Sequence, residues 1–381
     1  MPRPAQRVLV ALTVLIIAAS AVVNVPRAYL DFAGWPVLGR IPQAAEYGTD
    51  TISDIYEAKV VLHDVGDMYT KRGVEQTPLE ARTWSKEASG PYPPADLLIM
   101  AALYAAGERT GIGFYGFITL VAFAFIVTSA AYSLRTRWYV FPLIWTNVAY
   151  LGTRFFAVQD NSYLIMLALV MAAVCLALAG RRGAHVLVAT AIAVKLSPMY
   201  YLKEMTRMPR LTAAVVLAIV CAGLLLPYFI WPNYTYIYRF QQQRHGNYWT
   251  NTLASGSLVA IFGVVLAYVE ARREFDLEDR IGWSLVPVAM LLAMTMNAAR
   301  HLLIVLLVPD KRVVRSVAGA AALWLYWALP GRVPFGPVVY FATFFVWLAL
   351  GWHLRRIGWT TIRDDLRHPA RTARMMLGQA S

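Results

Sequence analysis

Long apolar segments recur along this chain and limit the folds open to it. Several approach or exceed the roughly 18 apolar residues that an α-helix needs to cross a bilayer. The 381-residue chain is 59% apolar and only 15% charged, whereas a soluble domain of this size would carry more charge. Because lipid offers no partner to the polar edge of an open sheet, the spanning segments must be helices. The sequence therefore predicts an all-α, polytopic membrane bundle.

The apolar segments divide the chain into one integral-membrane domain, residues 1–352, and a basic tail, residues 353–381. Roughly 10–12 membrane segments are expected. The first, at about 7–25, is interpreted as an uncleaved signal anchor rather than a signal peptide, because its apolar run extends to Val25. The later segments lie at about 95–107, 111–134, 138–151, 161–180, 184–202, 211–231, 252–269, 281–298, 301–309, 313–330 and 334–352.

The net charge of +13 is carried largely by short loops beside these segments. Such placement is typical of cytoplasmic loops and indicates affinity for anionic lipid headgroups rather than nucleic acid. Both termini are then expected in the cytoplasm of a bacterium, with residues 26–93 forming a long first outer loop and the tail lying on the membrane surface. The basic loops expected inside are 181–183, 203–210, 271–280 and 310–312.

Two segments do not fit simple crossings. Segment 95–107 is short and is expected to enter and leave on the same side. Segment 184–202 begins and ends at basic loops, with Lys195 past its middle and Pro198 breaking it. Irregular backbone at membrane depth is tolerated where it is buried in protein or lines a wet cavity, so a cavity open to the outer face is expected.

The outer loop contains an acidic stretch, "SDIYEAKVVLHDVGDMYTKRG", at residues 53–73. It predicts an amphipathic helix in the outer interface, ending near Gly66, with Glu57, Asp64 and Asp67 on its solvated face. Asp54 is expected near the helix start, where it either caps the helix or faces the cavity. The expected apolar face consists of Ile55, Ala58, Val61, Leu62 and Val65.

Motifs in a fixed order suggest a family. "D-x-Y-x-A…G-x-x-Y" is followed by "PYPPADLL", "VQDNSYLI", "AIAVKLSPMYYL" and a late histidine beside a short helix. Over roughly residues 45–310 this order resembles the polyprenyl-phosphate-mannose-dependent α-mannosyltransferases of the glycosyltransferase C (GT-C) superfamily. The resemblance implies a GT-C-type membrane bundle whose first outer loop bears a catalytic aspartate.

The resemblance assigns the family's loop acid to Asp54. Asp50 is an alternative, because the family often places the acid further ahead of the tyrosine than Asp54 lies, at a position where this chain has Ile52. Asp160 is another, since the family's "GQxN" appears as residues 158–161 without its glycine and with this extra acid. The family's other motifs map to Tyr92, Pro93 and Pro94, to Lys195 and Pro198, and to Arg300 and His301, where the first histidine of a pair is replaced.

The chemistry of a lipid-phosphate sugar donor agrees with these assignments. Its departing phosphate oxygens develop charge that nearby cations stabilise, and an intramembrane lysine is by default a functional candidate. Lys195, Arg300 and Arg154 are the candidate phosphate ligands, with His301 as a hydrogen-bond donor. The acceptor hydroxyl needs one carboxylate as base, which suffices for a single displacement that inverts the anomeric carbon.

Substrate contacts are expected from aromatic and amide side chains. The loop 232–251 is rich in both, and aromatic faces stack on sugars, although an interfacial aromatic belt would give the same composition. The candidate substrate-binding residues are Tyr56, Tyr92, Gln159, Asn161, Tyr248 and Trp249.

The sequence thus predicts a bacterial plasma-membrane enzyme with an outward-facing active site. It would transfer a sugar, mannose by the resemblance, from a polyprenyl-phosphate donor to a lipid or glycan hydroxyl. The sequence contains no recognisable cluster of metal ligands, although a divalent ion could bridge the donor phosphate. Cys175 and Cys221 both lie in apolar runs and are interpreted as small buried side chains. The alternative is a non-catalytic carrier of lipid-linked sugars or a membrane scaffold.

Overall fold

The computed structural model shows an all-helical chain over the residues that it describes, and no strand occurs among them. The all-α prediction is therefore confirmed for this part of the chain. The described residues are 49–67, 93–111, 161–231, 234, 248–273, 275–296 and 335–378. The helices are α2 (Thr49–His63), η2 (Val65–Asp67), α4 (Pro94–Thr110), α8 (Asn161–Leu178), α9 (Gly183–Val194), η4 (Met199–Arg207), α10 (Arg210–Leu224), α11 (Pro227–Ile230), α13 (Tyr248–Arg273), α14 (Leu277–Ser284), α15 (Val286–Met296), α18 (Phe335–Ile357), α19 (Trp359–Arg367) and α20 (Pro369–Met376).

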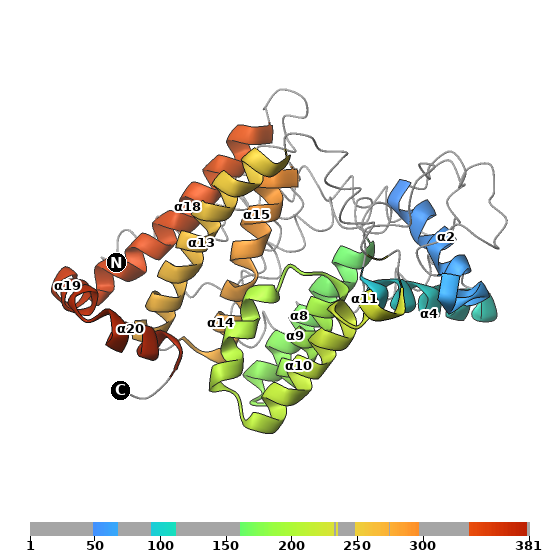
Figure 1. Ribbon diagram of the computed structural model, residues 1–381, viewed down its shortest axis with the longest axis horizontal. Coiled ribbons are helices and arrows are strands. Elements are labelled where there is room, and N and C mark those ends of the chain that lie inside the picture. Colours follow the sequence, from blue (N-terminus) through green and yellow to red (C-terminus); the bar gives the residue numbers. More distant parts are fainter. Residues whose placement is uncertain are drawn as a thin grey trace, which may run out of the picture.

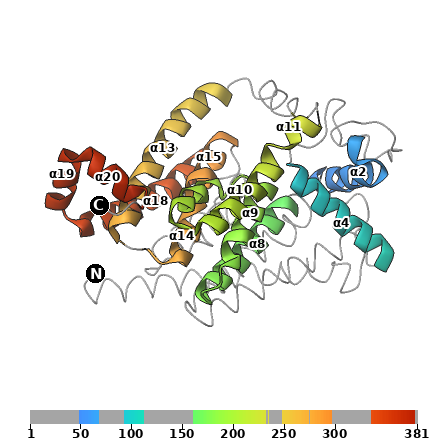
Figure 2. The ribbon, with the colours of Figure 1, turned by 60° about the horizontal axis from the view of Figure 1, so that its bottom comes forward.

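Three groups of helices follow one another along the longest axis (Figures 1 and 2). α2 and α4 pack together at one end, α8, α9 and α10 lie side by side in the middle, and α13, α15 and α18 form the third group. α19 and α20 lie beyond the third group, at the end farthest from α2 and α4. The predicted segments at 7–25, 111–134, 138–151, 301–309 and 313–330 lie outside the described residues.

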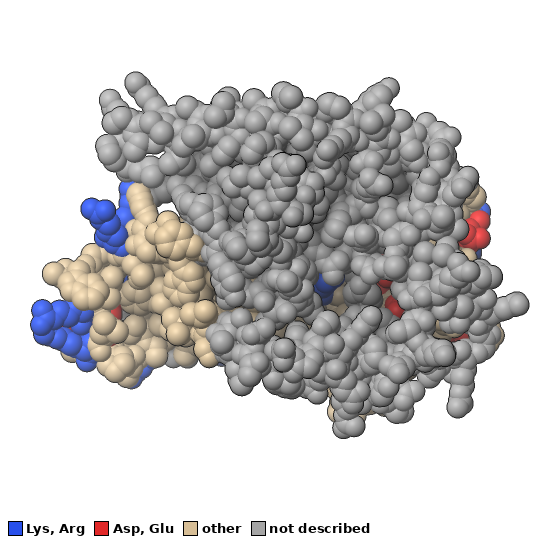
Figure 3. Space-filling view, turned by 90° about the horizontal axis from the view of Figure 1, so that it is seen from above, with Lys and Arg blue, Asp and Glu red and all other residues tan. Residues whose placement is uncertain are grey.

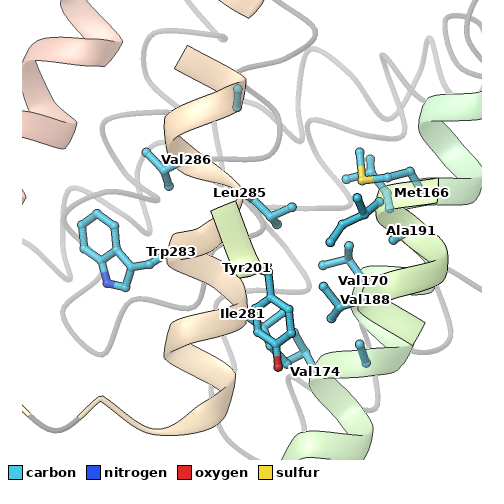
Figure 4. Packing of buried hydrophobic residues seen from close by; sticks show 14 of the residues in the cluster. Met166, Val170, Val174, Val188, Ala191, Tyr201, Ile281, Trp283, Leu285 and Val286 are labelled. Carbon is cyan, nitrogen blue, oxygen red and sulfur yellow. The ribbon is translucent and has the colours of Figure 1, made fainter. Parts of the chain in front are cut away.

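The middle group is held by close packing of small and branched side chains. α8 and α9 form a hairpin, and α10 packs against α9, where a Cβ placed on Gly223 would lie only 2.5 Å from the Cβ of Ala193. A glycine is required at this close approach. Figure 4 shows the core between α8, α9 and α14, in which Val170 and Val188 face Tyr201 and Ile281.

The segment predicted at 184–202 is broken, as expected. α9 ends at Val194, and Lys195 has an extended backbone (φ −150°, ψ 129°). Pro198 disfavours helical geometry in the residue before it, and the chain continues as the 3₁₀ helix η4. With 12 residues, α9 is only about 18 Å long, too short to cross a bilayer core of about 30 Å.

One helical stretch among the described residues, Arg210–Ile230, is long and apolar enough to cross a membrane. It has 21 residues and a mean hydropathy of 2.6. Ile165–Leu178 and Gly183–Val194 are apolar but shorter. The segment predicted at 281–298 is divided, because the helix is interrupted at Leu285 between α14 and α15. The predicted number of crossings stays a prediction.

Candidate functional site

Three carboxylates are buried on α2 and α4, two helices that pack against each other. Asp54 is 1% exposed, Glu57 3% and Asp96 0%. Ala58 of α2 shares a core cluster with Leu97 of α4, and Asp54 lies one helical turn before Ala58, on the same face. Burying carboxylates is costly unless they find partners, and all three take part in interactions. These buried acids make the pair of helices α2 and α4 the candidate site.

The structure corrects several expectations about α2. Glu57 was expected on the solvated face and is buried, whereas Leu62 and Val65, expected in the apolar face, are 50% and 47% exposed. The cause is tertiary: the contact with α4 covers only one part of the helix surface. Asp54 is not an N-cap, because α2 begins at Thr49 and Asp54 lies in its second turn.

The end of α2 agrees better with the sequence. The helix stops at His63, and the exposed Asp64 carboxylate accepts a hydrogen bond of 2.8 Å from the backbone N–H of Gly66. This Asx-type turn satisfies a backbone donor and ends the helix. Asp64 is therefore solvated, as predicted, but it lies in the turn after α2 and not on the helix itself.

Trp231, which follows the last residue of α11, joins α2 and α4 to the end of the stretch Arg210–Ile230. Its Nε1–H donates a hydrogen bond of 2.8 Å to the carbonyl oxygen of Val65, and its ring belongs to the same cluster as Ala58 and Leu97. Arg210–Ile230 is about 30 Å long if helical throughout. The carboxylates thus belong to one end of this apolar stretch, and Arg210 lies at the other.

Lys195 lies nearer the carboxylate end of that stretch than the basic end. Ala193, two residues before it, contacts Gly223 of α10, which is about 20 Å along the helix from Arg210. α4 contacts α9 and α10 as well as α2, so it joins the acid-bearing helix to the helix that ends at Lys195. The lysine is half-buried.

The opposite end of the bundle holds the basic loops together. Glu204 and Glu270 are buried, and Lys203 forms ion pairs with both carboxylates. Arg280 reaches Glu204 at 3.3 Å, so the loops 203–210 and 271–280 lie next to each other. Their orientation toward the cytoplasm stays a prediction. A polar hollow of about 500 Å³ opens here, lined by Arg207, Glu270, Ala271, Phe275, Asp276, Leu277 and Arg280. The cavity expected at the carboxylate end stays a prediction.

The other predicted site residues are only partly placed. The ring of Tyr56 is fully buried, and Asp50 lies in the first turn of α2. Asn161 begins α8, and Tyr248 and Trp249 begin α13; the side chains of Asp50 and of these three residues are not described. Outside the described residues lie Tyr92, Arg154, Gln159, Asp160, Arg300 and His301.

Sequence reasoning missed Asp96 and Glu57. Asp96 is an acid in the first turn of a helix whose next eleven residues are apolar or glycine, and an ionisable residue inside an apolar segment is the signal that could have identified it. Over the described ranges, no group of three or more histidine, cysteine or acidic side chains is arranged to hold a metal ion.

In comparisons with known proteins, no family model, curated protein or solved structure matches the chain.

Proposed function

We propose that the chain is a polytopic membrane glycosyltransferase that transfers a sugar from a polyprenyl-phosphate donor to a lipid or glycan hydroxyl, with inversion. The proposal rests on the motif resemblance to the mannosyltransferases and on one structural observation. That observation is the burial of Asp54 beside α4, at the end of the bundle remote from the basic loops. On the positive-inside interpretation of those loops, this end faces outward.

Asp54 would act as the general base that takes the proton from the acceptor hydroxyl as it attacks the anomeric carbon. The bond to the donor phosphate breaks in the same step, and the leaving phosphate carries the electron pair. Lys195 would stabilise its growing charge. The lysine suits this role because the end of α9 lies inside the apolar length of α10 and toward the carboxylates.

The test compares Asp54→Asn with Asp64→Asn in membranes supplied with polyprenyl-phosphate mannose. Asp64 is an exposed acid just beyond the same helix, so its variant matches the chemical change without touching the buried site. Transfer should fall by about 10² or more in Asp54→Asn, the range for loss of a general base, and be unchanged in Asp64→Asn. Detergent-solubilised size-exclusion profiles check that both variants fold.

Normal transfer by a folded Asp54→Asn would remove Asp54 as the base, and Asp50 and Asp160 would be substituted next. Binding of the donor without turnover in wild type, across acceptors, would favour the carrier or scaffold. In the same assay Lys195→Ala should raise the donor KM or abolish transfer. Unchanged kinetics would mean that the lysine only reaches toward the membrane surface.

A further inference from the structure

The tail forms two short helices fixed to the end of α13. α18 ends at Ile357, and Gly358 takes a positive φ of 90°, which L side chains rarely adopt, to turn the chain into α19. α20 follows after His368. Both helices leave the line of α18 (Figures 1 and 2).

Asp365 sets the rotation of α19 about its own axis. Its side chain is 1% exposed and accepts hydrogen bonds from the Tyr268 hydroxyl at 2.7 Å and from Arg272 Nε at 2.8 Å. Arg272 Nη2 binds the second oxygen, and Arg371 approaches it at 3.4 Å. Burial alone would raise the pKa of Asp365, but the bonds from Arg272 and Tyr268 outweigh it and hold that pKa below its usual range. The acid therefore stays ionised and paired.

With Asp365 turned inward, apolar and basic side chains face outward together. At about 100° per residue, Trp359, Arg363 and Leu366 share one face of α19, away from Asp365. Trp359 is 73% exposed and Leu366 72%, and Arg363 is also exposed. This face presents large apolar groups beside a cation.

The surrounding charge is strongly positive. Both acids of α19 are engaged, since Asp364 pairs with Arg371 at 2.8 Å and Asp365 is buried. Within the described part of the chain, Arg363, Arg367 and Arg374 form no ion pair. Figure 3 shows lysine and arginine side chains gathered at the end of the molecule that α19 occupies, with acidic atoms toward the other end.

We propose that the outward face of α19 docks on anionic phospholipid headgroups of the leaflet beside the basic loops. Arginines flanking tryptophan and leucine are the composition of a helix that lies in an interface. α19 also begins where the apolar helix α18 ends, just after Arg355 and Arg356, at the depth that tryptophan prefers. The inference rests on insertion of α18 in a membrane, which belongs to the proposed function, and not on sugar transfer.

The experiment uses the full chain in vesicles of phosphatidylcholine, with or without phosphatidylglycerol. Leu366→Cys carries a fluorophore, in a background where Cys175 and Cys221 are alanine, and brominated lipids quench a probe that lies in the membrane. Quenching should be several-fold stronger with phosphatidylglycerol. It should fall at about 1 M NaCl, where the Debye length is about 3 Å.

Two double variants that each remove two positive charges distinguish the effect of the arginines of α19 from the effect of the overall charge of the chain. Arg363→Gln with Arg367→Gln should abolish the preference for phosphatidylglycerol, whereas Arg181→Gln with Arg182→Gln, in the exposed turn between α8 and α9, should keep it. Equal quenching in both lipids, no quenching in either, or equal loss in the two double variants would each overturn the proposal. The readout needs no sugar donor, so an enzyme inactivated by Asp54→Asn should behave as wild type.

Discussion

Replacing Gly223 by alanine tests the contact that sets the position of Lys195. The added Cβ would lie 2.5 Å from Ala193 Cβ and 3.2 Å from Ala193 Cα, while carbon atoms in ordinary contact lie about 3.5 to 4.0 Å apart. α9 and α10 must therefore separate by about 1 Å. Neither contact is with the end of a flexible side chain, so a change of rotamer cannot relieve the overlap.

Two opposing effects decide the stability of Gly223→Ala. Alanine is favoured over glycine in a helix interior by about 1 kcal/mol, whereas overpacking costs about 1 to 3 kcal/mol. Because the closest approach is far inside contact distance, we expect the upper part of that range and a net loss of about 2 kcal/mol. The displaced end of α9 carries Lys195, so the donor KM should also rise.

The assay is thermal unfolding of the detergent-solubilised chain, with Gly351→Ala as matched control. Gly351 lies inside α18 and a Cβ there meets nothing within 4 Å among the described residues. Gly351→Ala should keep or raise Tm, whereas Gly223→Ala should lower it by several degrees. Adding Ala193→Gly removes the closest overlapping atom and should recover part of the loss. A Gly223→Ala variant as stable as Gly351→Ala, or no recovery in the double variant, would refute the reasoning.

Two further predictions concern single contacts. Asp365→Asn should cost about 2 kcal/mol, below the 3 to 5 for breaking a buried pair because Arg272 is 30% exposed. Since the folded pKa of Asp365 is lowered, its contribution is present above its unfolded pKa of about 3.9 and lost as pH falls through the folded value. A plot of Tm against pH should thus be flatter for Asp365→Asn than for wild type. An unchanged plot would show that the interactions of Asp365 with Tyr268 and Arg272 do not stabilise the fold. Trp231→Phe deletes the bond to the Val65 carbonyl oxygen and should cost about 1 kcal/mol, measured in the same way; a Tm equal to wild type would show that the bond contributes nothing.

The described helices follow closely from the sequence because the signals are local. Pro93 stands immediately before α4, Pro94 is its first residue, and Gly111 follows its last turn with φ 72°, which is the usual asymmetry of helix ends. Pro198 likewise predicts the break after α9. The interruption at Leu285 also has a local signal, because Pro287 in the first turn of α15 has no backbone N–H to donate to Trp283. Apolar length alone predicts one continuous segment there.

The candidate site was less predictable, because the burial of side chains on α2 depends on which other helix packs against it. An isolated α2 gives no reason to bury Glu57 rather than Leu62, and only contact with α4 decides it. The start of α2 is equally ambiguous, since Thr49, Asp50, Thr51 and Ser53 are all residues that start or cap helices. A start near Ser53 leaves Asp54 either a cap or a cavity residue, whereas a start at Thr49 puts it in the second turn, where it is buried.

Both ends of the bundle bury carboxylates, and the distance of these carboxylates from the basic loops bears on function. Glu204, Glu270 and Asp365 lie among arginines and lysines that pair with them directly, so their burial is explained by structure alone. Asp54, Glu57 and Asp96 lie on α2 and α4 at the other end, which faces outward only under the proposed orientation of the basic loops. Carboxylates that serve only to form ion pairs do not need to lie far from the basic loops. The proposed general base, Asp54, and the proposed phosphate ligand, Lys195, must lie away from those loops, because the proposed sugar transfer takes place on the outer side.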